Sequence, residues 1–314
     1  MQSADLLVSV FGRVASITAF IALGLFFANA LVAFGAVERV AGLARYLTGP
    51  ANLPDEVGTA ILATAASPTA GYGMLAEFRE DGLSDRATLV AVTTNTFFGF
   101  FQHVFTYYLP VLIPILGLRV GVMYVGARAA ISLAITLTGI VAGALLLPDP
   151  ATIDVTPDAP EREERDRREA VREAVSSTLS KLKTIVPRLL VVYLVVSWLT
   201  ATYDLTAVGG AADPLVSLVG LPAAAVPVIA VFAVDTTSGA VTIAPLVGDV
   251  FTPRQAVATM LVGGIVSFAV STFKRSIPFQ YGIWGASFGS KVIAVNTALK
   301  VAFIAVALVV LLAP

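Results

Sequence analysis

A carboxylate follows directly after a long apolar run in this sequence. Asp235 comes after Val226–Val234, and Thr236, Thr237 and Ser238 follow it. A carboxylate in the interior of a membrane is costly, and it commonly marks a proton, cation or substrate site. The same spacing also suits a helix N-cap, in which the side chain accepts hydrogen bonds from backbone N–H groups. Both roles are open for Asp235, and they are compatible with each other.

A second polar interruption of an apolar stretch carries hydroxyl groups but no carboxylate. Further hydroxyls and amides occur in Thr93–Thr96 and at Gln102, next to His103, the single histidine. Such groups within an apolar span either line a solute pathway or form hydrogen bonds between helices. We expect His103 itself to be a packed or interfacial residue. The candidate substrate-binding residues are Ser67, Thr69, Tyr72, Asn95, Gln102, Asp235, Thr236, Thr237 and Ser238, and Asp235 is also the candidate ion-coupling residue.

Missing residue types exclude several chemistries. The chain has no Cys and one His, which excludes thiolate chemistry and sites with several His ligands. The phosphate-binding pattern G-x-x-x-x-G-K-[ST] is absent, so ATP-driven pumping by this chain is not expected. The net charge is −1 without a basic stripe, which argues against nucleic-acid binding. We expect no enzyme activity, no cofactor and no metal.

The composition places these residues in a membrane. Of 314 residues, 57% are hydrophobic and 13% are charged, and the mean hydropathy is +0.87. Soluble domains carry about 25% charged residues, so this chain has too little polar surface for water. We therefore expect an all-α protein of the lipid bilayer, with a first transmembrane helix that is retained rather than cleaved.

A charged stretch divides the chain into two apolar parts. Eleven of the thirteen residues from 161 to 173 are charged. Acidic residues precede basic ones at i,i+4 spacing, which favours a solvated helix that cannot lie in lipid. We predict a first membrane repeat over residues 1–147, a charged cytoplasmic linker helix over 148–182, and a second membrane repeat over 183–314.

The two apolar parts align without a gap at an offset of 168 residues, which places Ser67 over Asp235. The same offset pairs Gly71 with Gly239, Pro110 with Pro278, and Gly117 with Gly285. Matches of Gly and Pro are informative because these residues fix backbone geometry. Each part is predicted to contain a long helix (8–34 and 184–203), an interrupted segment (about 56–80 and 222–249) and two further helices (84–108 and 120–147; 252–275 and 287–312).

The interrupted segment is either a broken crossing or a re-entrant hairpin. Irregular backbone at membrane depth requires surrounding protein or water in both cases. With a re-entrant hairpin, each repeat crosses the membrane three times, and the second repeat is inverted relative to the first. With a broken crossing, each repeat crosses four times, and the two repeats are parallel. Loop charges favour inversion. With the charged linker inside, inversion places Lys274 and Arg275 at the inner membrane surface, whereas full crossings would place them outside, and the loop 204–221 has no Lys or Arg, as an outer loop should. The predicted fold has two inverted repeats, each with three transmembrane helices and one re-entrant hairpin.

The segment Ala66–Arg86, followed by the Phe-rich Asn95–Gly117, resembles archaeal membrane proteins of the nucleoside-recognition, or Gate, type. Related gate regions occur in concentrative nucleoside transporters, in the pore part of bacterial ferrous-iron transporters and in paired spore-maturation membrane proteins. The resemblance covers about residues 54–146 and, more faintly, 222–314, and it implies a hairpin followed by gating helices. It does not imply nucleosides, because neither Ser67–Gly71 nor Asp235–Gly239 matches the Glu-containing tip motifs of nucleoside carriers.

These features predict a secondary transporter or permease that moves a small polar or anionic solute by alternating access at the paired tips. The alternative is a non-transporting scaffold or gate subunit that acts with a partner protein, and a lipid translocator is a third hypothesis. The expected partners are the lipid bilayer and a small-molecule or ion substrate, and a homodimer is compatible with a bundle of this size.

Overall fold

The protein is helical in the part of the chain that the computed structural model describes. That part comprises residues 45–148, 220–272 and 276–313, with isolated residues between 8 and 26 and between 168 and 198. Within these ranges, the one strand-like feature is an isolated bridge between Val247 and Phe251. The prediction of an all-α protein is confirmed. The predicted first helices of the two repeats (8–34 and 184–203) and the charged linker (148–182) lie largely outside the described residues.

Three helical stretches are long and apolar enough to cross a membrane. They are Asp85–Leu116, Leu118–Leu146 and Phe279–Leu312. The second stretch has 29 residues, which at about 1.5 Å per residue exceeds the roughly 30 Å of a hydrocarbon core. Their length and composition are those of a membrane protein, as the sequence predicts.

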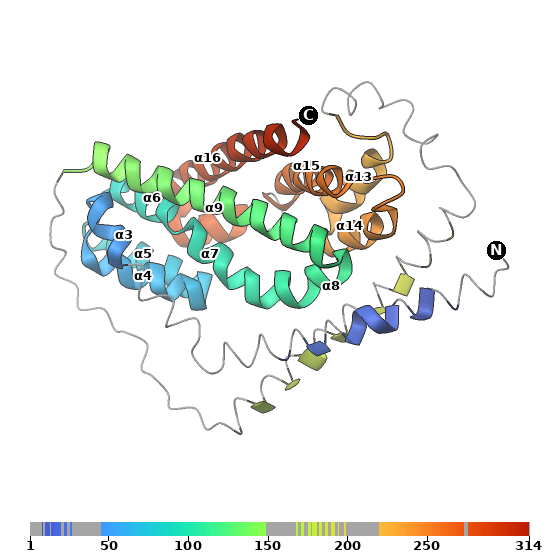
Figure 1. The fold of residues 1–314 in the computed structure, drawn as a ribbon. Helices are drawn as coiled ribbons and strands as arrows, with labels where there is room; N and C mark the ends of the chain where they lie inside the picture. Colours follow the sequence, from blue (N-terminus) through green and yellow to red (C-terminus); the bar gives the residue numbers. More distant parts are fainter. Residues whose placement is uncertain are drawn as a thin grey trace.

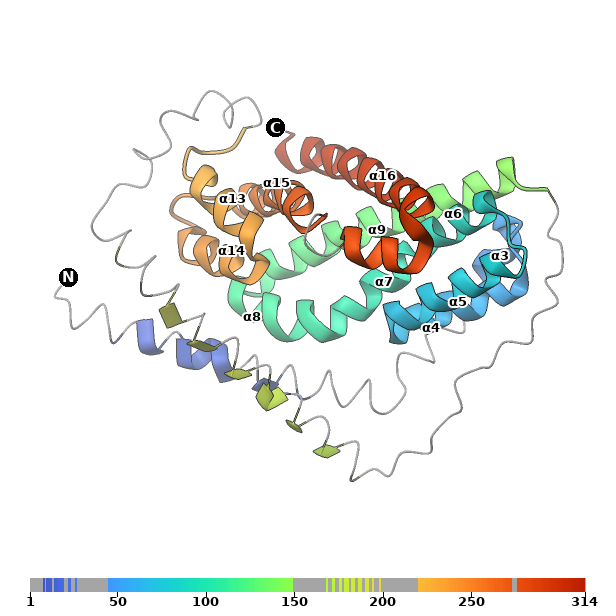
Figure 2. The same cartoon turned by 180° about the vertical axis from the view of Figure 1, so that it is seen from behind.

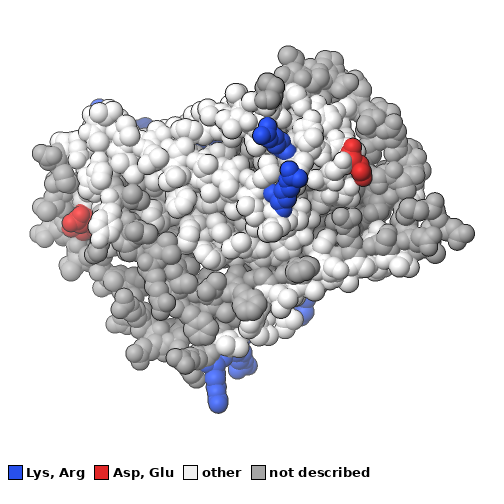
Figure 3. All heavy atoms as spheres, viewed as in Figure 1, with Lys and Arg blue, Asp and Glu red and all other residues white. Residues whose placement is uncertain are grey.

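The outer surface of the long helices is apolar. Leu133, Leu137, Val141 and Leu145 are all exposed, and their four-residue spacing places them on one face of the helix Leu118–Leu146. Few charged side chains interrupt the described surface on the face seen in Figure 3. Apolar patches of this extent are uncommon on soluble monomers, so this surface is suited to lipid.

The first part of the chain folds into a series of short helices that ends in one long helix. Its elements are α3 (Arg45–Thr48), the 3-10 turn η1 (Gly49–Ala51), α4 (Asp55–Ala66), α5 (Pro68–Glu80), α6 (Asp85–Thr94), α7 (Thr96–His103), the π-helix η2 (Val104–Leu112), α8 (Ile113–Leu116) and α9 (Leu118–Leu146).

The second part has the same kind of series. Its described elements are α13 (Ala225–Val234), α14 (Thr236–Ile243), the 3-10 turn η3 (Ala244–Leu246), α15 (Pro253–Ser271) and α16 (Ile277–Leu312).

The short helices gather at the two ends of the molecule, with the long helices α9 and α16 between them (Figures 1 and 2). One end holds α3, α4 and α5, and the other holds α13, α14 and α15. Helix α9 packs against α6 and α7 of its own part and against α15 and α16 of the second part. The interface between the two parts of the chain is therefore built around α9.

Each pair of short helices is joined by a single extended residue. Ser67 (φ −146°, ψ 110°) separates α4 from α5, and Asp235 (φ −149°, ψ 121°) separates α13 from α14. The two helices of each pair pack against each other. A Cβ on Gly239 would lie 2.5 Å from Phe232 Cβ, and one on Gly71 would collide with the backbone of Ala60, so the absent side chains permit the close packing.

Further backbone features recur at the same offset of 168 residues. Ser84 and Thr252 each accept a hydrogen bond as the N-cap of the next helix. Gly117 has φ 78° and ψ 160° before α9, and Gly285 has φ 74° and ψ 163° within α16. The features that match at this offset therefore include specific turns, caps and breaks, as well as residue types.

One predicted helix boundary is wrong. The helix expected over 84–108 continues to Leu116, because the π-helical segment η2 accommodates Pro110, whose ring would clash with the i−4 carbonyl of an ordinary α-helix. The helix expected over 287–312 is present, and the non-helical residue Gly285 separates it from a further helical stretch that begins at Ile277. Lys274 and Arg275, which the prediction places at the inner membrane surface, lie outside the described residues.

Candidate functional site

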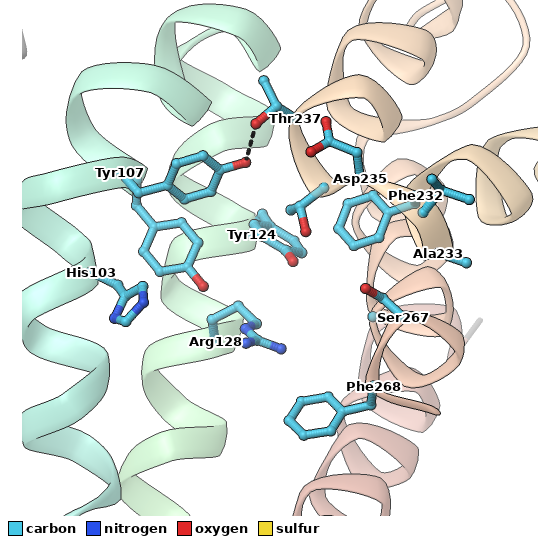
Figure 4. A pocket seen from close by; sticks show the side chains of 14 residues that line it. His103, Tyr107, Tyr124, Arg128, Phe232, Ala233, Asp235, Thr237, Ser267 and Phe268 are labelled. Carbon is cyan, nitrogen blue, oxygen red and sulfur yellow. Dashed lines mark hydrogen bonds between the residues drawn. The ribbon is translucent and has the colours of Figure 1, made fainter. Parts of the chain in front are cut away.

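A cavity of about 430 Å³ lies between the two parts of the chain. The segment that contains α7 and η2 contributes His103, Tyr107 and Tyr108, and α9 contributes Tyr124 and Arg128. The opposite wall comes from α13, the start of α14, and α15 (Figure 4). The lining from this second part comprises Phe232, Ala233, Val234, Asp235, Thr236, Thr237, Gly264, Ser267 and Phe268.

The π-helix η2 explains how three side chains from one segment reach the cavity. Its i→i+5 hydrogen bonding widens each turn, so that residues four and five apart share a side. His103, Tyr107 and Tyr108 have this spacing, and all three line the cavity. Short π segments occur frequently at functional sites, because they redirect side chains without ending the helix.

A hydrogen bond links the two walls at the second tip. The Tyr107 hydroxyl lies 3.1 Å from Thr237 Oγ1, and it joins η2 to α14 (Figure 4). Both groups can donate or accept, and a neutral bond of this kind contributes about 0.5–1.5 kcal/mol. The contact is therefore specific in geometry and contributes little to the total stability.

Asp235 caps helix α14. Its Oδ1 accepts a hydrogen bond of 2.7 Å from the backbone N–H of Ser238 and one of 2.8 Å from the Ser238 hydroxyl. The capping role predicted as one alternative is therefore observed. Asp235 also lines the cavity together with Thr236 and Thr237. The coupling role for Asp235 stays a prediction that is compatible with the cap.

Arg128 brings a cationic group from the middle of α9 to the cavity. The guanidinium lies beside the hydroxyl groups of Tyr108 and Tyr124. Its Nε is buried and has no hydrogen-bond partner among the described residues. In Figure 4 the side chain points from α9 towards the α15 side of the cavity, where Nη1 lies 3.9 Å from the position that a Cβ on Gly264 would take.

The first tip does not line this cavity. Ser67 is exposed at the end of α4, and Tyr72 packs edge-on against Phe279 and Trp284 of α16, with ring centroids 5.7 and 6.2 Å apart. Thr69 lies in α5, and its side chain is outside the described part of the structure. Among the described side chains, Ser67 and Tyr72 of the first tip are therefore not part of the lining that contains Asp235, Thr236 and Thr237.

Asn95 and Gln102 have other surroundings. Asn95 is buried at the break between α6 and α7, where its Nδ2 donates to Thr64 Oγ1 at 2.7 Å. Gln102 is half-buried, and its backbone carbonyl accepts a bond of 3.0 Å from the Thr106 hydroxyl. For Asn95, the observed contact corresponds to the predicted alternative of hydrogen bonding between helices.

Several residues that line the cavity are not among the candidate residues predicted from the sequence. Tyr107, Tyr108, Tyr124 and the α15 residues look like ordinary membrane-helix residues when the sequence is read alone. Arg128 gives a stronger signal, because a charge near the centre of a long apolar helix indicates a functional residue.

A serine motif also occurs at the kink of α16. Residues Gly285–Gly289 fit the hydrolase pattern G-x-S-x-G. In hydrolases that motif places the serine on a sharp turn between a strand and a helix. Here Ser287 is an exposed residue between two helical parts of α16, so the structural context of the hydrolase motif is not reproduced. No group of three or more His, Asp or Glu suited to a metal ion occurs in the described part of the chain.

The chain is similar over most of its length to two uncharacterized proteins of the archaeon Methanocaldococcus jannaschii. It is 27% identical to the uncharacterized protein MJ0871 over 241 residues, which cover 76% of this chain and 74% of that protein. It is 24% identical to the uncharacterized protein MJ0880 over 284 residues, which cover 89% of this chain and 91% of that protein. No protein-family model and no solved structure matches the chain. The alignment with MJ0880 is long enough to include both predicted repeats, and the resemblance to Gate-type proteins stays a prediction.

Proposed function

We propose that this protein is a secondary transporter or permease that moves a small polar or anionic solute across the cell membrane by alternating access. The observation that carries the proposal is the cavity of about 430 Å³ between the two parts of the chain. This volume is within the 300–1,000 Å³ typical of small-molecule sites. A solute held by both walls can be exposed to either side of the membrane when one part rocks against the other.

The proposed topology has two inverted repeats, each with three transmembrane helices and one re-entrant hairpin. The equivalent backbone breaks at Ser67 and Asp235, and at Gly117 and Gly285, support a repeat. The side-by-side packing within each short helix pair favours a hairpin over a broken crossing. Three crossings per repeat then require the second repeat to be inverted.

Asp235 is the proposed ion-coupling residue of this transporter. It lines the cavity at the second tip, where its Oδ1 accepts the two bonds from Ser238 that cap α14. A proton or cation that binds Asp235 would change the charge of the cavity wall. The resemblance to Gate-type proteins supports transport as the class of function, and it leaves the solute open.

Thiol labelling of the tips tests the proposal, because the natural chain has no cysteine to interfere. Single cysteines at Ser67, Thr69, Thr237 and Ser238 are treated from each side of sealed vesicles with a membrane-impermeant thiol reagent. Thr259, which is completely buried in α15, supplies the matched negative control. We expect both tips to be labelled and the Thr259→Cys variant to remain unlabelled.

Protection of all four tip positions from both sides, in protein that elutes as a folded species, would contradict transport through these tips. That result would favour the sealed scaffold or gate subunit, and binding partners would then be sought.

A further inference from the structure

We infer that the cavity binds a small organic anion, whose carboxylate or phosphate group pairs with Arg128 and whose apolar body packs against the surrounding aromatic rings. The inference rests on the proposed function and specifies the class of solute. It assigns to Arg128 the role of the anion-binding residue.

Arg128 has the properties of an anion-binding residue. A guanidinium presents several N–H donors in a planar fork that matches a carboxylate or phosphate. The Tyr108 and Tyr124 hydroxyls lie beside Arg128, and its buried Nε has no hydrogen-bond partner in the described part of the chain. A buried cation is costly without an anionic partner. An anionic group in the cavity would supply that partner.

The charges around the cavity favour an anion over a cation. Lys300 of α16 lies close enough to Arg128 to interact with it electrostatically, and its Nζ is 4.2 Å from the centre of the Phe268 ring, which lines the cavity. Asp235 is the one carboxylate among the described lining residues, and its Oδ1 accepts a hydrogen bond from Ser238. Among the described residues, Arg128 in the lining and the basic side chain of Lys300 beside it therefore face one carboxylate, Asp235.

The remaining surface favours an organic body. Six ring side chains line the cavity: His103, Tyr107, Tyr108, Tyr124, Phe232 and Phe268. The Tyr108 and Tyr124 rings contact each other edge-on, and so do the Tyr124 and Phe232 rings, with centroid distances of 6.3 and 6.5 Å. Such a wall offers flat apolar contacts, whereas the polar groups at Arg128, Thr237 and Ser267 fix the orientation of a bound molecule.

Isothermal titration of the purified full-length chain in detergent tests the inference. The probes are 4-hydroxybenzoate, phenyl phosphate, inorganic phosphate and the neutral isostere 4-hydroxybenzamide, with protein-free micelles as the blank. We expect at least one of the two organic anions to bind at least tenfold more tightly than both the amide and inorganic phosphate. Comparison of 4-hydroxybenzoate with phenyl phosphate also shows whether the site prefers a carboxylate or a phosphate.

Two variants locate the binding site. Arg128→Gln removes the cation without adding bulk, and we expect it to weaken binding of the anion at least tenfold, because hydrogen bonds to charged groups are the strong ones. Arg119→Gln is the matched control, because Arg119 lies exposed at the start of the same helix and is not part of the lining. We expect this variant to bind like the unmodified chain.

Absence of binding by both organic anions would overturn the inference, as would equal affinity for the amide or unchanged affinity in the Arg128→Gln variant. Lys300→Gln provides a second variant, from which we expect a smaller loss of affinity because Lys300 lies beside the cavity.

If the tips are labelled by thiol reagents but no anion binds, this inference fails while the transport proposal stands. If the tips are sealed, the transport proposal fails independently of the titration.

Discussion

Substitutions of Asp235 separate its observed capping role from its proposed coupling role. Asp235→Asn retains an oxygen that can accept the bonds from Ser238, and Asn is as good an N-cap as Asp. It removes the negative charge from the cavity wall. Asp235→Ala removes the charge and both hydrogen bonds. The two variants therefore differ in the cap and agree in the loss of the charge.

The expected free energies follow from the two hydrogen bonds. The Ala variant loses the cap of α14, which typically costs about 0.5–2 kcal/mol of stability. In the Asn variant, the N–H of Ser238 keeps a side-chain acceptor, and Asn and Asp are equivalent N-caps, so the cap is retained. Solvent exposure reduces the cost in the Ala variant, because Asp235 is only partly buried. We expect the Asn variant to unfold close to the unmodified chain and the Ala variant to be measurably less stable.

The assay combines thermal unfolding in detergent with uptake into proteoliposomes of whichever organic anion binds the unmodified chain. If Asp235 couples transport, both variants lose uptake driven by an ion gradient, although only the Ala variant loses stability. Gradient-driven uptake by the Asn variant at the unmodified rate would refute the coupling role. Equal stability of the Asn and Ala variants would refute the argument that the cap contributes to the stability of α14.

Two further substitutions test contacts between and within the walls. Tyr107→Phe removes the hydrogen bond to Thr237 and should cost about 0.5–1.5 kcal/mol of stability. In a double-mutant cycle with Thr237→Val, the two effects should be less than additive, and full additivity would mean that the bond contributes nothing. Gly239→Ala places a Cβ 2.5 Å from Phe232 Cβ and should destabilise the chain by about 1–3 kcal/mol. The control Gly282→Ala meets no atom within 4 Å and should be neutral or stabilising, so similar unfolding temperatures for the two Ala variants would contradict the close packing of α13 and α14.

The helical class and the positions of the breaks could be predicted from the sequence. Apolar content and helix length determine the membrane assignment, and the matched Gly and Pro residues locate the interruptions at Ser67 and Asp235. Helix ends were harder to predict, because Pro110 usually signals a helix boundary. Here the π-helical segment η2 contains Pro110, and the helix continues to Leu116.

The candidate site could be predicted only in part. Asp235, Thr236 and Thr237 were found because polar residues after an apolar run are conspicuous, and all three line the cavity. The tyrosines and Phe268 were not found, because their place in the cavity depends on the packing of α9 against α15, which links distant segments of the chain. Asn95 and Tyr72 are equally conspicuous in the sequence, but packing uses them elsewhere, against Thr64 and against α16.

Labelling of a single cysteine at Thr237 tests the central claim most directly, because this residue stands at the contact between the two walls. The rate of reaction with an impermeant thiol reagent is measured from each side of oriented vesicles, with and without the organic anion that binds best. Alternating access predicts that the thiol reacts from both sides and that the bound anion slows both reactions. Reaction from one side alone, at a rate that the anion does not change, would contradict the account.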